Sequence, residues 1–145
     1  GCRVSTIKHA HHSFDIDQPG KDTYVHREAG AHEVMISSHN RWALMHENRG
    51  ETEPDLSLLI SHMSPVDLVL VEGFKSYPHP KLEIYRTNLG QPMLFGEDKH
   101  IVAIATDGPV YNVNLPVFDL EDSVSIAKFI LRHCGLSPHS VNNTV

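Results

Sequence analysis

A short apolar run near the middle of the chain restricts the fold more than any other feature. Leu68 to Val71 are all apolar, and Glu72 and Gly73 follow at once. An apolar run without alternation indicates a strand that is buried on both faces, as in a parallel sheet. Ligands of open α/β proteins bind beyond the carboxyl ends of such strands, where we expect Glu72 to lie. Two roles stay open for Glu72 on this pattern alone, a ligand contact and a cap for a neighbouring loop.

The rest of the sequence alternates short apolar stretches with amphipathic ones. We expect strands at 3–9, 33–38, 41–46, 67–72, 82–86, 101–106 and 115–118, and helices at 22–29, 54–63 and 124–134. The second and third strands are close enough to form a hairpin, and a buried helix segment stays open as an alternative for 41–46. Thr52 is placed to cap the second helix. The apolar face of that helix is expected in the core and consists of Leu56, Leu59, Ile60 and Met63. This order of elements predicts an α/β fold with helices flanking a mainly parallel sheet.

The composition limits both the number of domains and the classes of partner. With 145 residues and 40% hydrophobic content, the chain is long enough for one domain over 1–145, with residues 136–145 as a flexible tail. The formal net charge of -6 argues against non-specific binding to nucleic acids or anionic membranes. No apolar run approaches the roughly 20 residues that cross a bilayer, and no leader opens the sequence. We therefore expect a soluble, cytoplasmic protein without a membrane or nucleic-acid partner.

Polar side chains follow three of the predicted strands, at the points where those strands end. The segments are Lys8 to Asp17, Glu72 to Lys75 and Thr106 to Asp107. If the sheet is mainly parallel, the carboxyl ends of its strands meet at one rim, where α/β proteins bind their ligands. The sequence therefore indicates a candidate site at this rim, and its side chains allow two chemical interpretations.

The first interpretation is a site for nucleotide phosphates. Lysine ammonium groups suit phosphate oxygens, and carboxylates suit magnesium and its water shell. The candidates are Lys8 and Lys75 for phosphate, Glu72 with Asp15 or Asp17 for magnesium, and Asp107 for a purine ring. Neither GxxxxGK[ST] nor GxGxxG occurs in the printed residues. Composition and spacing alone therefore do not decide in favour of nucleotide binding.

The second interpretation is a metal site in the loop from His9 to Asp17. His9, His11 and His12, together with Asp15 or Asp17, offer nitrogen and oxygen ligands for zinc or nickel. On an extended segment His9 and His11 point the same way. Structural zinc sites usually contain cysteines or a second spaced histidine pair, and neither is evident, so loop histidines that form hydrogen bonds are favoured. A non-catalytic dimerisation or metal-binding module built on this loop stays open as an alternative function.

Two segments together resemble a known family. The first, Ile7 to Glu47, contains the string KHxHHxFDxDxPGKDT, and the second, Leu68 to Lys75, reads LVLVEGFK. With the later strand IVAIATD, they are similar to the MobB family of molybdopterin-guanine dinucleotide biosynthesis, and they cover most of the chain. The resemblance implies a P-loop NTPase-like, GTPase-related fold, a homodimer, and binding of GTP and Mg²⁺ with weak hydrolysis in the complete protein. It also implies a role in assisting MobA, the partner that attaches GMP to molybdopterin.

The resemblance also assigns roles to individual residues. Glu72 and Gly73 match the family's Walker B end, where the acid holds a magnesium water. Asp107 lies where such folds often recognise guanine. The loop facing the γ-phosphate is expected to contain Lys8, His9, His11, Asp15 and Asp17.

The match has one departure at its start. Family members begin with a strand, a Walker A loop and a helix, whereas this sequence begins at what corresponds to the second strand. We therefore expect a sheet without the N-terminal strand and the P-loop. By themselves, the printed residues are expected to bind GTP weakly or not at all and to be inactive in its hydrolysis.

Overall fold

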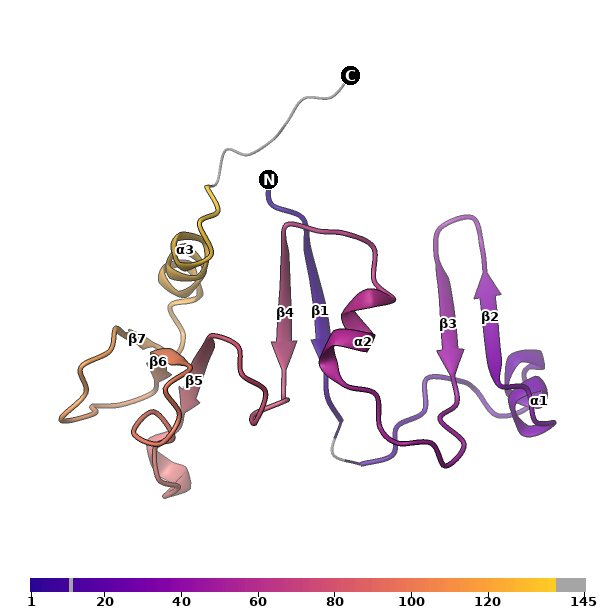
Figure 1. The fold of residues 1–145 in the computed structure, drawn as a ribbon, viewed down its shortest axis with the longest axis horizontal. Helices are drawn as coiled ribbons and strands as arrows, with labels where there is room; N and C mark the ends of the chain where they lie inside the picture. Colours follow the sequence, from indigo (N-terminus) through magenta and orange to yellow (C-terminus); the bar gives the residue numbers. More distant parts are fainter. Residues whose placement is uncertain (11, 138–145) are drawn as a thin grey trace. The chain divides into compact units, whose positions relative to one another are not determined.

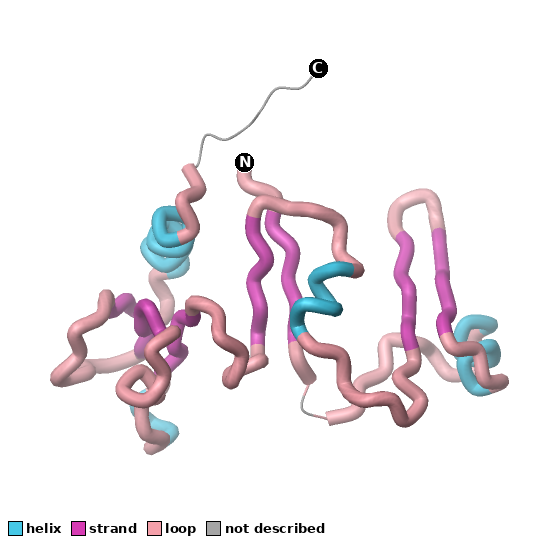
Figure 2. The backbone as a smooth tube through the Cα atoms, viewed as in Figure 1, coloured by secondary structure: helices cyan, strands magenta, loops and turns pink. Residues whose placement is uncertain are grey.

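The computed structural model describes residues 1–10 and 12–137, and Figures 1 and 2 show the course of the chain. His11 and residues 138–145 lie outside the described residues. The predicted nucleotide contact of His11 and most of the predicted flexible tail over 136–145 therefore also lie outside them.

Strands and helices follow one another as the sequence predicts. The strands are β1 (Val4–Lys8), β2 (Glu33–Ser37), β3 (Trp42–His46), β4 (Leu68–Glu72), β5 (Lys81–Tyr85), β6 (Ile101–Thr106) and β7 (Val117–Asp119). The helices are α1 (Asp22–Glu28), α2 (Leu56–Ser61), the short 3₁₀ helix η1 (Thr87–Leu89) and α3 (Ser123–His133). Within the described ranges, no helix combines the length and the apolar character needed to cross a bilayer.

The chain divides into two compact units. The sheet unit contains Gly1–Ile7, Val66–Leu70 and the residues from Phe74 onward. The hairpin unit contains Lys8–Pro65 and Val71–Gly73. The boundary between the units therefore crosses β1 and β4, and the single domain expected over 1–145 stays a prediction.

β1 and β4 pair with each other as a two-stranded sheet (Figure 1). At one end, the Arg3 carbonyl oxygen accepts hydrogen bonds from the Asp67 and Leu68 amides at 3.0 and 3.2 Å. At the other end, the His9 amide donates to the Glu72 carbonyl oxygen at 2.8 Å. The strands therefore run parallel, and both end on the same side.

The burial of β4 differs from the sequence prediction. The run Leu68–Val71 predicts a strand buried on both faces, but no residue of β4 is fully buried and Leu70 is 40% exposed. In the described part of the chain β4 has β1 as its strand partner, and a two-stranded sheet leaves much of its surface accessible. The prediction of a fully buried β4 is therefore wrong.

Among the described strands, β6 of the sheet unit is the most deeply buried. β5, β6 and β7 form a parallel sheet in that order (Figure 1). β6 is central and pairs with both neighbours, with Ile104 opposite Val117. Ile104 is enclosed at 0% exposure, and its neighbours Ala103 and Ala105 are equally buried. A central parallel strand requires such a run, so the core of this unit lies along β6.

α3 packs on this sheet through an aromatic contact. Asp122 caps the helix, because its side chain accepts a hydrogen bond from the Ser125 amide at 3.0 Å. Phe129 of α3 lies against Phe118 of β7, with ring centroids 5.2 Å apart. The helix stops ahead of Gly135, whose φ of +67° suits glycine, as the sequence predicts.

In the hairpin unit, β2 and β3 form the antiparallel hairpin that the sequence predicts. Met35 lies opposite Leu44, and the Ser38 amide closes the turn by donating to the Arg41 carbonyl oxygen at 2.8 Å. α1 contacts β2, where Val34 is 7% exposed. The apolar interior of this unit is therefore small.

α2 begins later than the sequence predicts. Its N-cap is Asp55, whose side chain accepts a hydrogen bond from the Leu58 amide at 2.8 Å. The prediction that Thr52 caps the helix is therefore wrong. An aspartate caps better than a threonine, and Pro54 favours extended backbone in the residue before it, so the helix starts after Asp55.

The apolar face of α2 is also less buried than predicted. Leu56 is 2% exposed, but Ile60 is 40% exposed. Leu59 and Met63 are half-buried. Because a helix over Leu56–Ser61 has less than two turns, only its first apolar residue reaches the interior.

Candidate functional site

The carboxyl ends of β1 and β4 carry a pair of opposite charges. Lys8, the last residue of β1, forms an ion pair with Glu72, the last residue of β4. Both side chains are exposed, at 67 and 71%. An exposed ion pair contributes little to stability, so both groups remain accessible to a ligand. The structure thus brings two of the predicted site residues together at the predicted strand ends.

The turn after Glu72 depends on the glycine at position 73. Gly73 has a φ of +95°, which side-chain-bearing residues rarely adopt. A Cβ atom at this position would lie 2.6 Å from Cβ of His9, closer than real Cβ atoms approach. The His9 amide also donates to the Glu72 carbonyl oxygen at 2.8 Å. His9 and the Glu72–Gly73 turn are therefore fixed against each other.

The ring of His9 has a partner that the sequence does not indicate. Nε2 of His9 lies 2.6 Å from Oε1 of Glu53, and the His9 side chain is 25% exposed. Glu53 is 44 residues away, in a polar loop ahead of α2. No motif or periodicity distinguishes Glu53 in that loop. The fold brings the pair together, and sequence reasoning therefore missed it.

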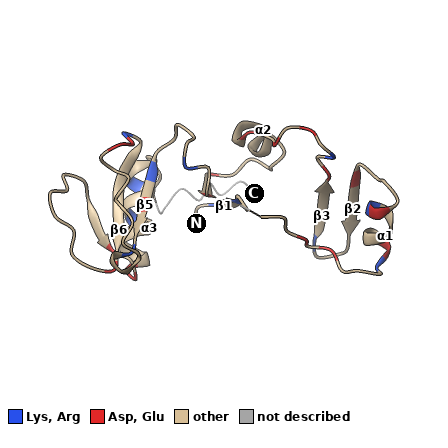
Figure 3. Cartoon of the chain, turned by 90° about the horizontal axis from the view of Figure 1, so that it is seen from below, with Lys and Arg blue, Asp and Glu red and all other residues tan. Residues whose placement is uncertain are grey.

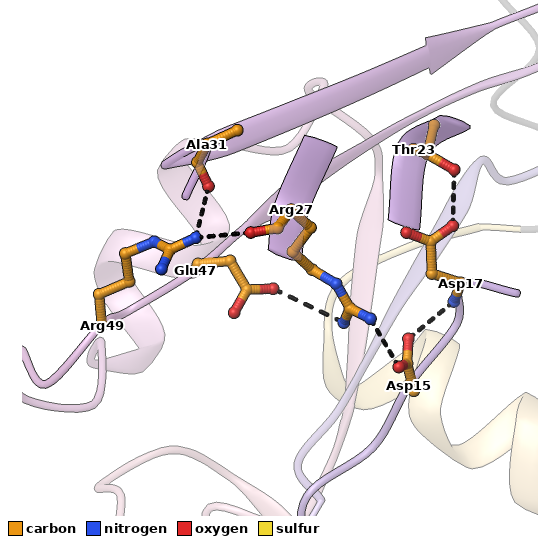
Figure 4. Close-up of polar contacts among 7 residues, drawn as sticks. All are labelled: Asp15, Asp17, Thr23, Arg27, Ala31, Glu47 and Arg49. Atoms are coloured by element: carbon orange, nitrogen blue, oxygen red, sulfur yellow. Dashed lines mark hydrogen bonds and ion pairs between the residues drawn. The ribbon is translucent and has the colours of Figure 1, made fainter. Parts of the chain in front are cut away.

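Asp15 and Arg27 form the centre of a second group of polar residues (Figure 4). Nη2 of Arg27 donates to Oδ2 of Asp15 at 2.7 Å, and the Asp17 amide donates to Oδ1 at 2.9 Å. These hydrogen bonds, first that of Arg27 and then that of Asp17, hold the pKa of Asp15 below its usual value. Nη1 of Arg27 lies 3.8 Å from Oε1 of Glu47. The guanidinium on α1 therefore joins the loop after β1 to the residue that follows β3.

Asp17 is anchored to the same helix (Figure 4). Oγ1 of Thr23 donates to Oδ1 of Asp17 at 2.7 Å. The other carboxylate oxygen, Oδ2, is buried and has no hydrogen-bond partner among the described residues. Such an atom costs free energy until a cation or a water molecule satisfies it. The Asp17–Thr23 contact gives the FDxD and KDT parts of the sequence string a structural role, which is to link the loop to α1.

Arg49 binds the other end of α1. Its Nη2 donates to the carbonyl oxygens of Arg27 and Ala31, each at 2.9 Å, at and just beyond the C-terminal end of the helix (Figure 4). Cζ of Arg27 lies 5.1 Å from the centre of the Tyr24 ring, within the range of a cation–π contact. Sequence reasoning missed Arg27 and Arg49, because their partners are set by the fold.

A polar hollow lies beside this group. Its volume is about 350 Å³, and it is lined by Asp15, Tyr24, Arg27, Glu28, Glu47 and Arg49. In Figure 3 the ribbon on and around α1 is coloured for both basic and acidic residues. The lining therefore contains both charges, and within it Arg27 pairs with Asp15 and Glu47 whereas Arg49 binds backbone carbonyl oxygens.

The predicted magnesium ligands are not gathered into one group. Asp15 pairs with Arg27, and Glu72 pairs with Lys8. Within residues 1–10 and 12–137, no three His, Cys, Asp or Glu side chains are arranged to hold a metal ion. Magnesium commonly takes one or two carboxylates and completes its shell with water and phosphate oxygens, which an exposed Glu72 suits. The assignment of Glu72, Asp15 and Asp17 to a metal stays a prediction.

Lys75 and Asp107 belong to the sheet unit. Lys75 is exposed in the segment after β4. Oδ1 of Asp107 accepts hydrogen bonds from the amide and from Oγ1 of Thr87, at 2.8 and 3.0 Å. The Thr87 amide is the largest cause that lowers the pKa of Asp107. Asp107 therefore holds the residues after β5 near the end of β6, and its contact with a purine stays a prediction.

The sequence matches that of known proteins over most of its length. The family model MobB, molybdopterin guanine dinucleotide synthesis protein B, matches residues 1–107. The molybdopterin-guanine dinucleotide biosynthesis adapter protein of Escherichia coli (strain K12) is 42% identical over 135 residues, which cover 91% of this chain and 77% of that protein. The protein of the same name from Haemophilus influenzae is 37% identical over 128 residues, which cover 88% of this chain and 71% of that protein.

Solved structures share the fold. A crystal structure of molybdopterin-guanine biosynthesis protein B superposes with a TM-score of 0.69 at 23% identity, and the match covers 92% of this chain and 82% of that one. Bacillus subtilis MobB gives a TM-score of 0.65 at 24% identity, with 90% and 79% covered. The implied P-loop NTPase-like α/β fold is thereby confirmed. Since the family model matches more than half of its residues, the chain belongs to the MobB family of molybdopterin guanine dinucleotide synthesis proteins.

Proposed function

We propose that this chain is a cytoplasmic adapter in the synthesis of molybdopterin guanine dinucleotide. Its partner is a MobA-type guanylyltransferase, which attaches GMP to molybdopterin. Membership in the MobB family supports the proposal, as does the name that the Escherichia coli and Haemophilus influenzae relatives share. The side chains at the ends of β1 and β4 suggest how the chain takes part.

These strand ends are proposed to form the acidic side of a GTP–magnesium site. The observation that carries this proposal is the exposed carboxylate of Glu72, at the end of a parallel strand where α/β folds bind ligands. Lys8 beside it supplies an ammonium group for a phosphate oxygen. Asp107 is the candidate for the guanine base. Magnesium, when bound, neutralises phosphate charge, and slow GTP hydrolysis is part of the proposal.

Titration of the full-length protein with a fluorescent GTP analogue, with and without magnesium, tests this site. Glu72→Ala is expected to weaken the magnesium-dependent affinity about tenfold, because a carboxylate of the metal shell is lost. Glu121→Ala removes an exposed acid elsewhere and serves as the control. Equal affinities for the wild type and the Glu72→Ala protein would contradict the proposal.

The proposed adapter is a homodimer, and one face of the β2–β3 hairpin supports this part of the proposal. Residues directly opposite each other in the hairpin point to the same face. Met35 and Leu44 are opposite each other, and Trp42 lies on the same face opposite Ser37. Their exposures are 61% for Met35, 41% for Leu44 and 63% for Trp42. Aromatic and methionine side chains are enriched at protein interfaces, so this face suits a second copy of the chain.

Light scattering measures this association directly. Trp42→Glu is expected to weaken the dimer by about 2 kcal/mol, because a buried tryptophan is commonly a dominant interface residue. Tyr111→Glu changes an aromatic residue that is 78% exposed in the other unit, and it is the control. A dimer that is unaffected by Trp42→Glu would place the interface elsewhere.

A further inference from the structure

We propose that Glu53 is a positioning residue that sets the Glu72–Gly73 turn through the ring of His9. This inference rests on the proposed nucleotide function and deepens it, since Glu72 is the carboxylate proposed to face magnesium. Glu53 itself needs no contact with the nucleotide. The polar loop ahead of α2 thereby becomes a controlling part of the site.

The first link is the contact between Glu53 and His9. Nε2 and Oε1 are 2.6 Å apart, which is within hydrogen-bond distance. An ionised carboxylate has no proton to give, so Nε2 is the donor and carries the proton. The His9 side chain is 25% exposed and that of Glu53 is 65% exposed. A carboxylate that reaches in from the solvent therefore holds a mostly enclosed ring in one orientation.

The second link joins His9 to the turn. Cβ of His9 fills the space that a side chain at position 73 would need, since a Cβ there would lie 2.6 Å away. The His9 amide is bound to the Glu72 carbonyl oxygen at 2.8 Å. Rotation about the Cα–Cβ bond of His9 leaves Cβ in place but moves Cγ, which lies 3.4 Å from the same point, so a rotated ring presses on Gly73 or opens a gap beside it. Because Gly73 already has a φ of +95°, such a change alters the backbone that carries the Glu72 carboxylate.

The ion pair between Lys8 and Glu72 does not replace these links. Both of its side chains are mostly exposed, and long exposed side chains hold one geometry poorly. The position of the Glu72 carboxylate therefore depends mainly on the backbone beneath it. That backbone is contacted by His9, and the His9 ring is held by Glu53.

Nuclear magnetic resonance of the full-length protein tests the contact without any ligand. The Nε2 proton of His9 is expected to give a resolved signal in the wild type, because its hydrogen bond slows exchange with water. Glu53→Ala should remove this signal and shift the Gly73 amide resonance. Glu53→Gln keeps an acceptor oxygen and should retain both. Glu51→Ala, an exposed acid in the same loop, is the matched control and should also retain both.

Magnesium-dependent GTP affinity tests the consequence for the site. Glu53→Ala and His9→Ala are each expected to weaken it about fivefold. The double variant should be no weaker than either single variant, because both residues act along one path. Glu53→Gln and Glu51→Ala should leave the affinity close to that of the wild type.

An unchanged Gly73 amide resonance in the Glu53→Ala protein would overturn the proposal, and so would additive losses in the double variant. If the wild type binds no GTP in the presence of magnesium, the proposed nucleotide function fails. In that case the His9 and Gly73 signals still decide whether Glu53 positions the turn. Circular dichroism of each variant separates these results from unfolding.

Discussion

Different interactions stabilise the interior of the sheet unit and the interior of the hairpin unit. Along β6, side chains are enclosed, and Ile104 and Ala105 have 0% exposure. Among the described residues of the hairpin unit, Val34 and Leu56 are the buried apolar side chains, and Arg27 ties the loop after β1 to α1. The free energy gained by apolar burial is roughly proportional to the buried area, whereas the contribution of an ion pair is lost when either partner is removed. Residues of the candidate site in the hairpin unit are therefore positioned by contacts that one substitution can remove.

The largest effect is expected from the core of the sheet unit. Ile104→Ala removes an enclosed side chain and leaves a cavity, which should cost about 3 kcal/mol of unfolding free energy. Ile84→Ala, on the neighbouring strand at 57% exposure, is the matched control and should cost less than about 1 kcal/mol. Urea unfolding measures both values. Equal losses for the two variants would contradict the assignment of the core to β6.

A smaller and more local effect is expected from Arg27→Ala. The Arg27 side chain is 15% exposed, and its loss removes the partner of Asp15 and Glu47. Hydrogen exchange of the α1 amides should become about tenfold faster, because the helix can then open locally without first breaking the contact between Arg27 and the loop. The β6 amides should keep their protection. Arg41→Ala, at the exposed hairpin turn, is the control. Equal loss of protection in both units would remove the distinction between them.

Local sequence patterns predict where the strands and helices of this fold lie better than they predict how deeply those elements are buried. The runs at Leu68–Val71 and Ile101–Thr106 are both apolar, and both are strands. Only the second is buried, because β6 has strand partners on both sides whereas β4 pairs with β1 in the described part of the chain. Strand partners come from distant segments, so an apolar run identifies a strand without identifying its place in the sheet. Thr52 and Asp55 show the same limit at shorter range, since both residue types can cap a helix.

The candidate site was predictable where its residues end a strand. Lys8 and Glu72 end β1 and β4, and the strand pattern places them at one rim. Glu53 and Arg27 were not predictable, because each meets its partner through the fold and neither belongs to a periodic pattern. Asp15 and Asp17 were recognised as polar residues of a conspicuous string, but the sequence does not reveal that α1 holds both.

The smallest effect is a pH dependence that should appear in the sheet unit alone. Nδ1 of His79, just ahead of β5, is buried without a hydrogen-bond partner among the described residues. Burial is the largest cause that lowers the pKa of His79 below 6.5, followed by the positive charges of Lys81 and His100, while Asp98 acts in the opposite direction. His79 is therefore neutral in the folded protein at a pH where the unfolded chain already binds a proton.

The sign of the effect follows from this difference in proton binding. The contribution of neutral His79 to stability is complete above about pH 6.5 and is lost as the pH falls below it. Asp15 of the hairpin unit has its pKa lowered from 3.8, so its contribution is lost only in stronger acid. Between about pH 7.5 and about pH 5.5, protection of the β6 amides should thus fall slightly while that of the α1 amides stays constant.

Two variants test the assignment to His79. Because glutamine cannot take up a proton, His79→Gln should remove the fall in β6 protection, whereas His133→Gln, at an exposed position on α3, should keep it. A fall that persists in the His79→Gln protein would show that another group in the sheet unit takes up the proton, and a parallel fall in α1 would show that the two units open together.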